Sequence, residues 1–573
     1  MNRLLRPILL ILGVISAALL AYGLWTMPSP APEDAEGFSS ARVVKDIEVI
    51  SKEHHSVAHP VERARVREYL KNRLAALGAD TVRTFRYDSL TGPQNKHVVY
   101  TFDAENVLAD FAPLSPSDDT TYLMMVAHYD SRYSQPVLRD TVWSYGAADD
   151  GYGVGVILET VAQALKSRED WKQGIRVLFT DAEEVGMMGM KAMWENDRQE
   201  FSDVGFVINV EARGPWGPAL LFEACPGNDK VLELYASEAG YPYTYSLTTV
   251  VYGFMPNFTD FTIIKDEVPG LNFSTIADVN HYHTDLDNFG NISERSIQHY
   301  GSQILPVTMA YLTDEKYSDK DALKSDADTV NFTVPLIGML NFSKAGYLVF
   351  NVIVFIIFLL VFALEGVRGR IKATKVLKHS AIALGLSLLV LVLGELVAYL
   401  CALSVGAAFK PFGITAGISF DNAAMIVSVA VMFLAMVAVY VLNRRKALLK
   451  VAGSMRASAA FNAASGYACN ALYGTLALMF VLSAALVFTL GENLMFLIPL
   501  VCATSALLLW RVTSWKGWIL LGIMVILLHA FSFLYALAMA LTIGAFGAVA
   551  MLAFLDLMVI IPMADIYAFI RKK

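Results

Sequence analysis

The stretch TTYLMMVAHYD at residues 120–130 leads through the glycine-rich turn GAADDGYG at 146–153 into the apolar run GVGVILETVAQALK at 153–166. The first run predicts a buried strand, and the run after the turn predicts a helix. Two more strands are expected in IRVLFTDAEE and VGFVINVEA, at residues 175–184 and 204–212. Strands that alternate with helices in this way are typical of an α/β fold with a mostly parallel sheet flanked by helices.

Histidine and carboxylate side chains occupy the turn and the ends of these expected strands: His128, Asp130, Asp149, Glu183, Glu184, Glu211 and, in the later segment HYHTDLD, His283. In an open α/β sheet, ligands bind in the crevice beyond the carboxyl ends of the strands. Imidazole and carboxylate without thiolate form the donor set of a catalytic zinc site, and manganese or cobalt also suits it. The sequence therefore predicts a metal site at this edge of the sheet.

The spacing of these residues indicates a division of labour. His128 and Asp130 are two apart and face the same side of a strand, so the Asp130 side chain is expected to accept a hydrogen bond from the second ring nitrogen of His128. The adjacent Glu183 and Glu184 cannot both point at one ion, so we expect one to bind metal and the other to move protons. Asp149 has two carboxylate oxygens and is suited to bridging two ions about 3.5 to 4 Å apart.

Five motifs together resemble the co-catalytic zinc exopeptidases that include bacterial leucyl aminopeptidase and aminopeptidase Y. They are VAHYDS at 126–131, GAADDG at 146–151, DAEEVG at 181–186, INVEARG at 208–214 and HYHTDLD at 281–287. The order of an anchor, this domain and many apolar runs is similar to the family's multi-span membrane branch, which includes the endoplasmic-reticulum metallopeptidase and the vacuolar membrane protease.

The resemblance implies roles for seven side chains: His128 and Glu211 in one zinc site, Glu184 and His283 in the other, Asp149 as the bridge, Glu183 as general base and Asp130 as the partner of a ligand histidine. Glu211 stands where the soluble members commonly have aspartate, which leaves the metal spacing and preference open. The implied reaction is hydrolysis of a peptide substrate at its free amino end, with two zinc ions as cofactors. Manganese or cobalt would also fit.

Three alternatives stay open at this point. Glutaminyl cyclases of the same fold use a single zinc ion for transamidation, and HYDS at residues 128–131 is similar to them. A carboxypeptidase would trim the other end of a peptide. Relatives that have lost their ligands act as receptors or scaffolds, and the full ligand set disfavours this alternative.

The chain is too apolar for a soluble protein of its length, with 573 residues, 55% hydrophobic residues and a mean hydropathy of +0.47. Arg3 and Arg6 precede an uncharged apolar run at 8–27, which we interpret as an uncleaved anchor rather than a signal peptide. The expected domains are an amino-terminal anchor at 1–27, a linker at 28–40, an extracytoplasmic zinc peptidase domain at 41–315, a stalk at 316–346 and a seven-span transmembrane domain at 347–573.

The seven expected spans lie at 347–364, 381–403, 423–442, 467–488 and 494–510, with two more in 518–561. With the anchor inserted amino end inward, every Lys/Arg cluster between the spans falls on the side of Arg3 and Arg6. This places the peptidase domain outside the cytoplasm, in the periplasm of a bacterium with the spans in the inner membrane, or in an organelle lumen. Membrane lipid is an expected partner and nucleic acid is not, because no basic arm is present. The oligomeric state stays open.

Overall fold

The computed structural model describes residues 27–92, 101–117, 119–133, 135–137, 140–253, 258–334, 337–411, 441 and 457–569. The predicted anchor up to residue 26 lies outside these residues, as does the predicted span at 423–442 except for residue 441. The chain divides into two compact units with the boundary between Lys344 and Ala345. We call them the α/β unit and the helical unit.

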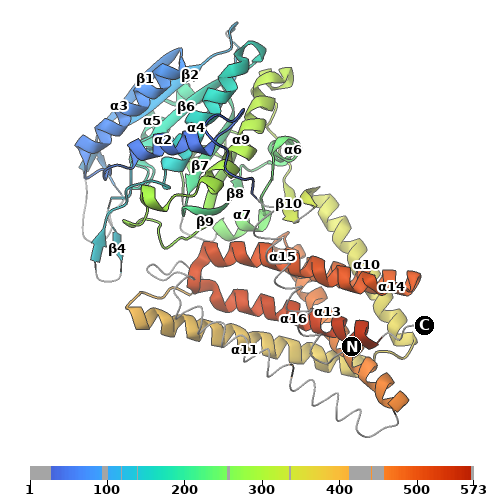
Figure 1. Cartoon of the computed structure of the whole chain (residues 1–573). Coiled ribbons are helices and arrows are strands. Elements are labelled where there is room, and N and C mark those ends of the chain that lie inside the picture. The colour runs from blue at the N-terminus through green and yellow to red at the C-terminus, as the bar shows by residue number, and fades with distance from the viewer. Residues whose placement is uncertain are drawn as a thin grey trace. The chain divides into compact units, whose positions relative to one another are not determined.

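A seven-stranded sheet forms the centre of the α/β unit, in the order β1-β2-β6-β3-β7-β9-β8 (Figure 1). The strands are β1 (Thr81–Thr91), β2 (Thr101–Phe111), β3 (Tyr122–His128), β6 (Gly174–Thr180), β7 (Val204–Ala212), β8 (Trp216–Ala224) and β9 (Gly270–Ala277). β6, β3, β7 and β9 run parallel, whereas β1, β2 and β8 pair antiparallel at the two edges. The predicted α/β class is confirmed, and the parallel part is limited to the four central strands.

Every residue of β6 and β7 is buried, as expected for parallel strands that are covered on both faces. The covering helices are α2 (Ser40–Ile50), α3 (Pro60–Leu77), α4 (Gly151–Ala164), α5 (Met188–Asn196), α6 (Asp229–Glu238), α7 (Ser246–Gly253), α8 (Phe261–Ile264) and α9 (Glu294–Thr313). Helices α2, α4 and α9 pack against one another (Figure 1).

The order of the central strands positions the site. After β3 the chain crosses by α4 to β6, and after β6 it crosses back by α5 to β7, on the other side of β3. Right-handed crossovers in opposite directions place α4 and α5 on opposite faces of the sheet. The carboxyl ends of β3 and β7 therefore meet at a topological switch point, where α/β proteins form their ligand sites.

The segment expected to be a stalk contains an antiparallel hairpin of β10 (Thr329–Val334) and β11 (Gly338–Ser343). Phe332 is 1% exposed, and the Thr333 N–H donates to the Thr244 carbonyl at 2.9 Å. These residues therefore pack as part of the α/β unit.

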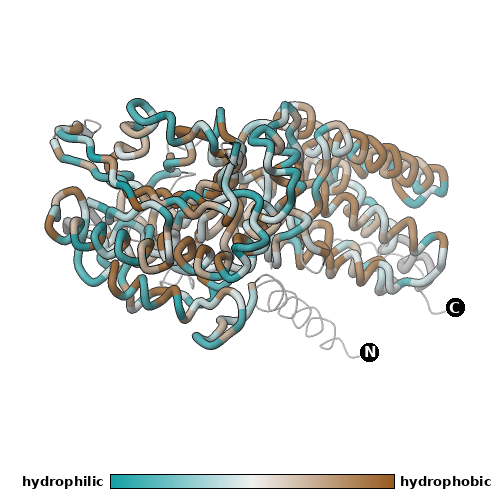
Figure 2. The backbone as a smooth tube through the Cα atoms, turned by 90° about the horizontal axis from the view of Figure 1, so that it is seen from above, coloured by the Kyte–Doolittle hydropathy of each residue, from teal (hydrophilic) through white to brown (hydrophobic). Residues whose placement is uncertain are grey.

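The helical unit contains α10 (Lys344–Val367), α11 (Ala373–Val405), α13 (Ala457–Thr489), α14 (Leu494–Thr513), α15 (Gly517–Leu541) and α16 (Phe546–Phe569). Among the described residues, five stretches are long and apolar enough to cross a membrane, and the last of them, Gly517–Tyr567, contains both α15 and most of α16. Figure 2 shows the hydrophobic character of these helices. They overlap six of the seven predicted spans.

Candidate metal centre

The five predicted metal ligands come together beyond the carboxyl ends of the parallel strands. His128 is the last residue of β3, and Glu211 is the last but one of β7. Glu184 follows β6, Asp149 precedes α4 and His283 follows β9. Four of them are buried, with exposures from 1% for His128 to 9% for Glu211, and His283 is largely buried, with 12% of its side chain exposed. His128, Asp149 and Glu184 each place a donor atom within 4.8 Å of the other two.

Asp149 lies between the two histidines. Its Oδ1 atom is 3.1 Å from Nε2 of His128, and its Oδ2 atom is 3.3 Å from Nε2 of His283. A further carboxylate accompanies each histidine: Glu211 Oε2 lies 3.7 Å from Nε2 of His128, and Glu184 Oε2 lies 3.0 Å from Nε2 of His283. The five side chains thus divide into two half-sites that share one aspartate.

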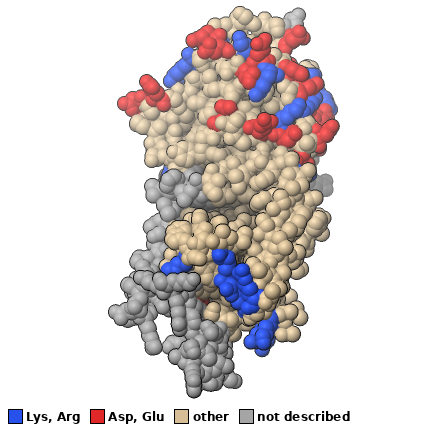
Figure 3. Space-filling view, turned by 90° about the vertical axis from the view of Figure 1, so that its right-hand side faces the viewer, with Lys and Arg blue, Asp and Glu red and all other residues tan. Residues whose placement is uncertain are grey.

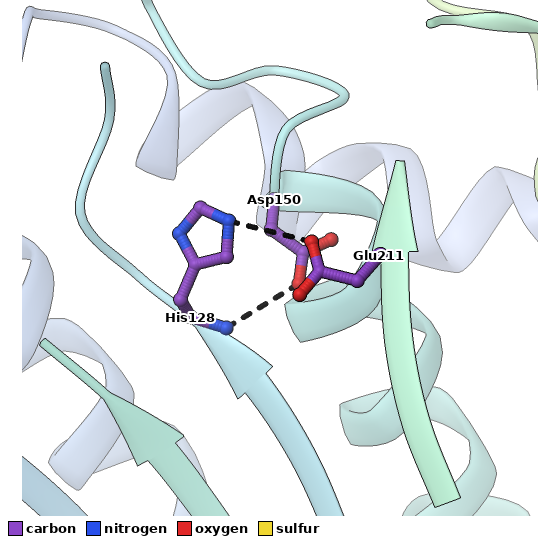
Figure 4. A group of neighbouring side chains, drawn as sticks. All are labelled: His128, Asp150 and Glu211. Atoms are coloured by element: carbon purple, nitrogen blue, oxygen red, sulfur yellow. Dashed lines mark hydrogen bonds and ion pairs between the residues drawn. The ribbon is translucent and has the colours of Figure 1, made fainter. Parts of the chain in front are cut away.

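Asp150 accepts hydrogen bonds from the backbone, and one of its carboxylate oxygens also lies within 4.8 Å of donor atoms of His128 and Glu211, a group that could hold a metal ion. One of its carboxylate oxygens accepts from the Gly153 N–H at 2.9 Å and caps α4, and the other accepts from the His128 N–H at 3.3 Å. Figure 4 shows this carboxylate beside the His128 ring and the Glu211 carboxylate. The two hydrogen bonds from Gly153 and His128 tie this carboxylate to the start of α4 and to the end of β3.

Asp130 acts through two different groups. The second ring nitrogen of His128, Nδ1, lies 2.9 Å from the backbone carbonyl of Asp130 and 3.6 Å from its carboxylate, so the hydrogen bond goes to the carbonyl. The carboxylate instead accepts from the backbone N–H groups of Glu183 at 2.9 Å and Glu184 at 3.4 Å. The side chain predicted to orient the histidine therefore holds the two glutamates in place.

The sharp turn after β6 presents Glu183 and Glu184 to the site. Ala182 adopts a positive φ of 57°, a conformation that non-glycine residues seldom adopt and that clusters at functional sites. Glu184 pairs with His283 and with Arg132, whose Nη1 is 3.2 Å from Oε2. Burial and the neighbouring carboxylates raise the pKa of Glu183 well above its ordinary value, although His128 opposes this.

Burial and the contacts between histidines and carboxylates shift the pKa values at this centre. Burial raises the pKa of Glu211 well above its ordinary value despite the opposing charge of His128. For Asp149 burial also acts upward, but hydrogen bonds from His128 and His283 outweigh it and lower the pKa. Burial would lower the pKa of His128, yet Asp130 and Asp149 raise it well above its ordinary value.

The residues at this edge fit a divalent metal. Glu184 Oε1 is buried without a hydrogen-bond partner, and three ligand carboxylates face two imidazoles in a site with little solvent. Burying so many carboxylates is costly unless cations compensate their charge. Neutral imidazole and ionised carboxylate are the forms that bind zinc, manganese or cobalt.

Three residues of the site carried no role in the sequence prediction. Asp287 accepts from the Ala148 N–H at 2.7 Å and from the Ser144 hydroxyl at 2.9 Å, and so fixes the turn that carries Asp149. Asp260 is 1% exposed and accepts from the Thr180 hydroxyl. Arg132 anchors Glu184. Asp287 lies within a recognised motif, whereas no pattern in the sequence distinguishes Asp260.

An α/β sheet whose strand ends gather buried histidines and carboxylates has the donor set and the placement of a metal site. Residues 106–308 match peptidase family M28. This part of the chain is therefore an M28 metallopeptidase domain, and the predicted resemblance to zinc exopeptidases and their membrane branch is confirmed.

The chain is similar to two groups of membrane peptidases. It is 28% identical over 260 residues to endoplasmic reticulum metallopeptidase 1 of Homo sapiens. This alignment covers 44% of this chain and 27% of that protein. It is 26% identical over 285 residues to the vacuolar membrane protease of Lodderomyces elongisporus, covering 47% of this chain and 28% of that protein. The match spans about a quarter of the length of these relatives.

Two solved structures align with the α/β part of the chain. A leucine aminopeptidase precursor from Bacteroides thetaiotaomicron is 18% identical, with a TM-score of 0.38, and covers 50% of this chain and 99% of that one. A glutaminyl cyclase from Porphyromonas gingivalis is 18% identical, with a TM-score of 0.37, and covers 48% of this chain and 99% of that one.

Proposed function

We propose that this chain is a membrane-bound exopeptidase that hydrolyses the peptide bond next to a free amino end and uses two metal ions, zinc in the simplest case. The observation that carries the proposal is the position of Asp149, whose two carboxylate oxygens face two different histidines at 3.1 and 3.3 Å. A carboxylate placed in this way is suited to bridging two ions.

His128 and Glu211 would hold one ion, and Glu184 and His283 the other, with Asp149 between them. When bound, two such ions lower the pKa of a water molecule and polarise the scissile carbonyl group. Glu183, whose pKa is raised by burial, would accept the proton of the attacking water and return it to the leaving amine. Asp130 supports this role because it fixes the Glu183 backbone at 2.9 Å.

The excess of carboxylates supports recognition of a free amino end. Glu183, Asp260 and Asp150 are carboxyl groups close to the ligand set but outside it, and they interact electrostatically with His128. Burial raises the pKa values of these groups, and a substrate ammonium group would stabilise their ionised forms, because partly buried charges are poorly screened. A blocked amino end would lose this interaction.

For the location, we propose that the α/β unit lies on the side of the membrane opposite the exposed Lys/Arg clusters. The relatives are named for the endoplasmic reticulum and the vacuolar membrane, which supports an organelle lumen. A bacterial inner membrane with the domain in the periplasm is the other location that the charge pattern allows.

The test is the metal content of the purified full-length protein, together with cleavage of dipeptides that have free or blocked amino ends. About two ions per chain with cleavage of free amino ends alone supports the proposal. About one ion, with cyclisation of an amino-terminal glutaminyl peptide and no cleavage, would favour a glutaminyl cyclase. Cleavage of amino-blocked peptides from the carboxyl end would favour a carboxypeptidase, and the absence of bound metal would favour a scaffold.

A further inference from the structure

Arg213 lies two residues beyond Glu211 at the end of β7. Its N–H donates to the Thr275 carbonyl at 2.9 Å and to the Ser274 hydroxyl at 3.0 Å, so the pairing of β7 with β9 continues through this residue. Because alternate residues of a strand point to the same side, the Arg213 and Glu211 side chains share one side of the sheet.

The backbone cannot easily move away from this position. A Cβ atom on the next residue, Gly214, would lie 2.2 Å from the Ala277 carbonyl oxygen of β9. The close approach of the two strands therefore requires glycine at position 214. It fixes the direction in which the Arg213 side chain leaves the strand.

Two tyrosines connect Arg213 with the metal centre. The Tyr282 ring stacks on the His283 ring with centroids 3.5 Å apart, and Tyr282 interacts electrostatically with Arg213 and Asp149. Tyr252 of α7 interacts in the same way with Arg213 and Glu211. Each tyrosine therefore lies near Arg213 and also near a predicted ligand of the metal centre.

Within the part of the chain that the structure describes, no carboxylate pairs with Arg213, and its Nη2 atom is buried without a hydrogen-bond partner. Arg132 differs, because its guanidinium pairs with Glu184. Burying a guanidinium nitrogen without an acceptor is unfavourable. The residue as a whole keeps part of its surface exposed, so a ligand can approach the side chain from solvent.

We propose that Arg213 binds the free carboxylate of the substrate, which makes short peptides, and dipeptides above all, the preferred substrates. This inference rests on the proposed function. In a strand, residues 211 and 213 lie about 7 Å apart along the chain. In a dipeptide the free carboxylate belongs to the residue that follows the scissile bond, and the Cα atoms of the two residues are about 3.8 Å apart. If the scissile carbonyl lies beside Glu211, the carboxylate is therefore within reach of the long Arg213 side chain. Guanidinium and carboxylate match in a bidentate geometry.

The experiment compares leucylglycine with its carboxyl-terminal amide, using the full-length metal-loaded protein. The wild type is expected to prefer the free acid. Arg213→Gln should lower kcat/KM for the free acid by about 10- to 100-fold, mainly through KM, because a charged hydrogen bond is lost. The value for the amide should change by less than about twofold on the same argument. Arg198→Gln, which changes an exposed arginine paired with Glu267, is the matched control and should change neither.

A measurement of binding separates this inference from the proposed reaction. In a Glu183→Gln background, calorimetry should show tighter binding of the free acid than of the amide, and Arg213→Gln should remove the difference while the metal content stays unchanged. Equal binding of both peptides overturns the carboxylate contact, even if the wild type hydrolyses them. A loss in kcat that is equal for both peptides also overturns it, because Arg213 would then act on the reacting carbonyl. If the wild type hydrolyses neither peptide but the free acid still binds more tightly than the amide, the proposed function is overturned and the carboxylate contact stands.

Discussion

Glu183 and Glu184 are neighbours in the sequence but differ in their contacts. Glu184 pairs with His283 at 3.0 Å and with Arg132 at 3.2 Å, so its charge is compensated inside the protein. Among the described residues, Glu183 has no ion pair, and burial raises its pKa well above the ordinary value. A compensated carboxylate suits a metal ligand, and a carboxylate with a raised pKa suits a general base.

Glu183→Gln should therefore keep the bound metal and lose most of the turnover. The amide has nearly the same shape as the carboxylate but cannot accept a proton, so kcat should fall by about 10²- to 10⁴-fold. Metal analysis and steady-state kinetics on one preparation check both parts. Glu195→Gln, on the exposed surface of α5, is the control. Wild-type turnover in the Glu183 variant would remove this residue from the role of base.

At the scale of elements, the sequence predicted what depends on local pattern. The apolar runs that become β3, β6 and β7 are evident, and so is the turn with Asp149 that leads into α4. The antiparallel edges were not predictable, because side-chain alternation does not encode the direction of a neighbouring strand. The hydrogen bonds from Ser144 and Ala148 to Asp287 were missed for a related reason, since they join segments that are about 140 residues apart in the chain.

The contact between Asp287 and this turn predicts how stability depends on pH. Burial, with the charge of Asp149, raises the pKa of Asp287 from 3.8 to about 7. The folded state therefore binds more protons than the unfolded state between these values, and the stability that Asp287 contributes is lost as the pH rises from about 4 to about 7. Metal-free protein should have a lower Tm at pH 7.5 than at pH 5, measured by thermal unfolding.

Two changes should reduce this difference in Tm. Asp287→Asn keeps an acceptor for the Ala148 N–H and cannot ionise, so it should flatten the dependence on pH. Added zinc should do the same, because it compensates the charge of Asp149. Asp285→Asn, at an exposed position in the same segment, should leave the dependence unchanged. A Tm that rises between pH 5 and pH 7.5 in the metal-free wild type would contradict the assignment.

At the scale of the whole molecule, charge separates the two units. On the face shown in Figure 3, acidic and basic side chains are interspersed on the α/β unit, whereas the charged side chains visible on the helical unit are mainly Lys and Arg. The buried Glu365 at the end of α10 pairs with Arg370 at 3.1 Å and with Arg511 at the end of α14 at 3.0 Å. Exposed basic side chains follow α10 in the chain: Arg368, Lys372, Lys375 and Lys378.

These basic residues, together with the length of α10, predict on which side of the membrane the α/β unit lies. Helix α10 has 24 residues, or about 36 Å at 1.5 Å per residue, which exceeds the ~30 Å apolar core of a bilayer. The α/β unit ends at Lys344, where α10 begins, and the basic cluster follows its other end. Because Lys and Arg near the ends of spans stay in the cytoplasm, the α/β unit should face the opposite side.

Single cysteines introduced on each side of α10 test this orientation. Ser117→Cys lies on the exposed surface of the α/β unit, and Thr374→Cys lies between Lys372 and Lys375. In sealed vesicles with the lumenal or periplasmic face outward, a membrane-impermeant maleimide should label position 117 at once and position 374 only after detergent is added. Labelling of position 374 alone would place the metal centre in the cytoplasm. Labelling of both positions would mean that α10 does not cross the bilayer, because a 24-residue helix cannot span it and leave both ends on one side.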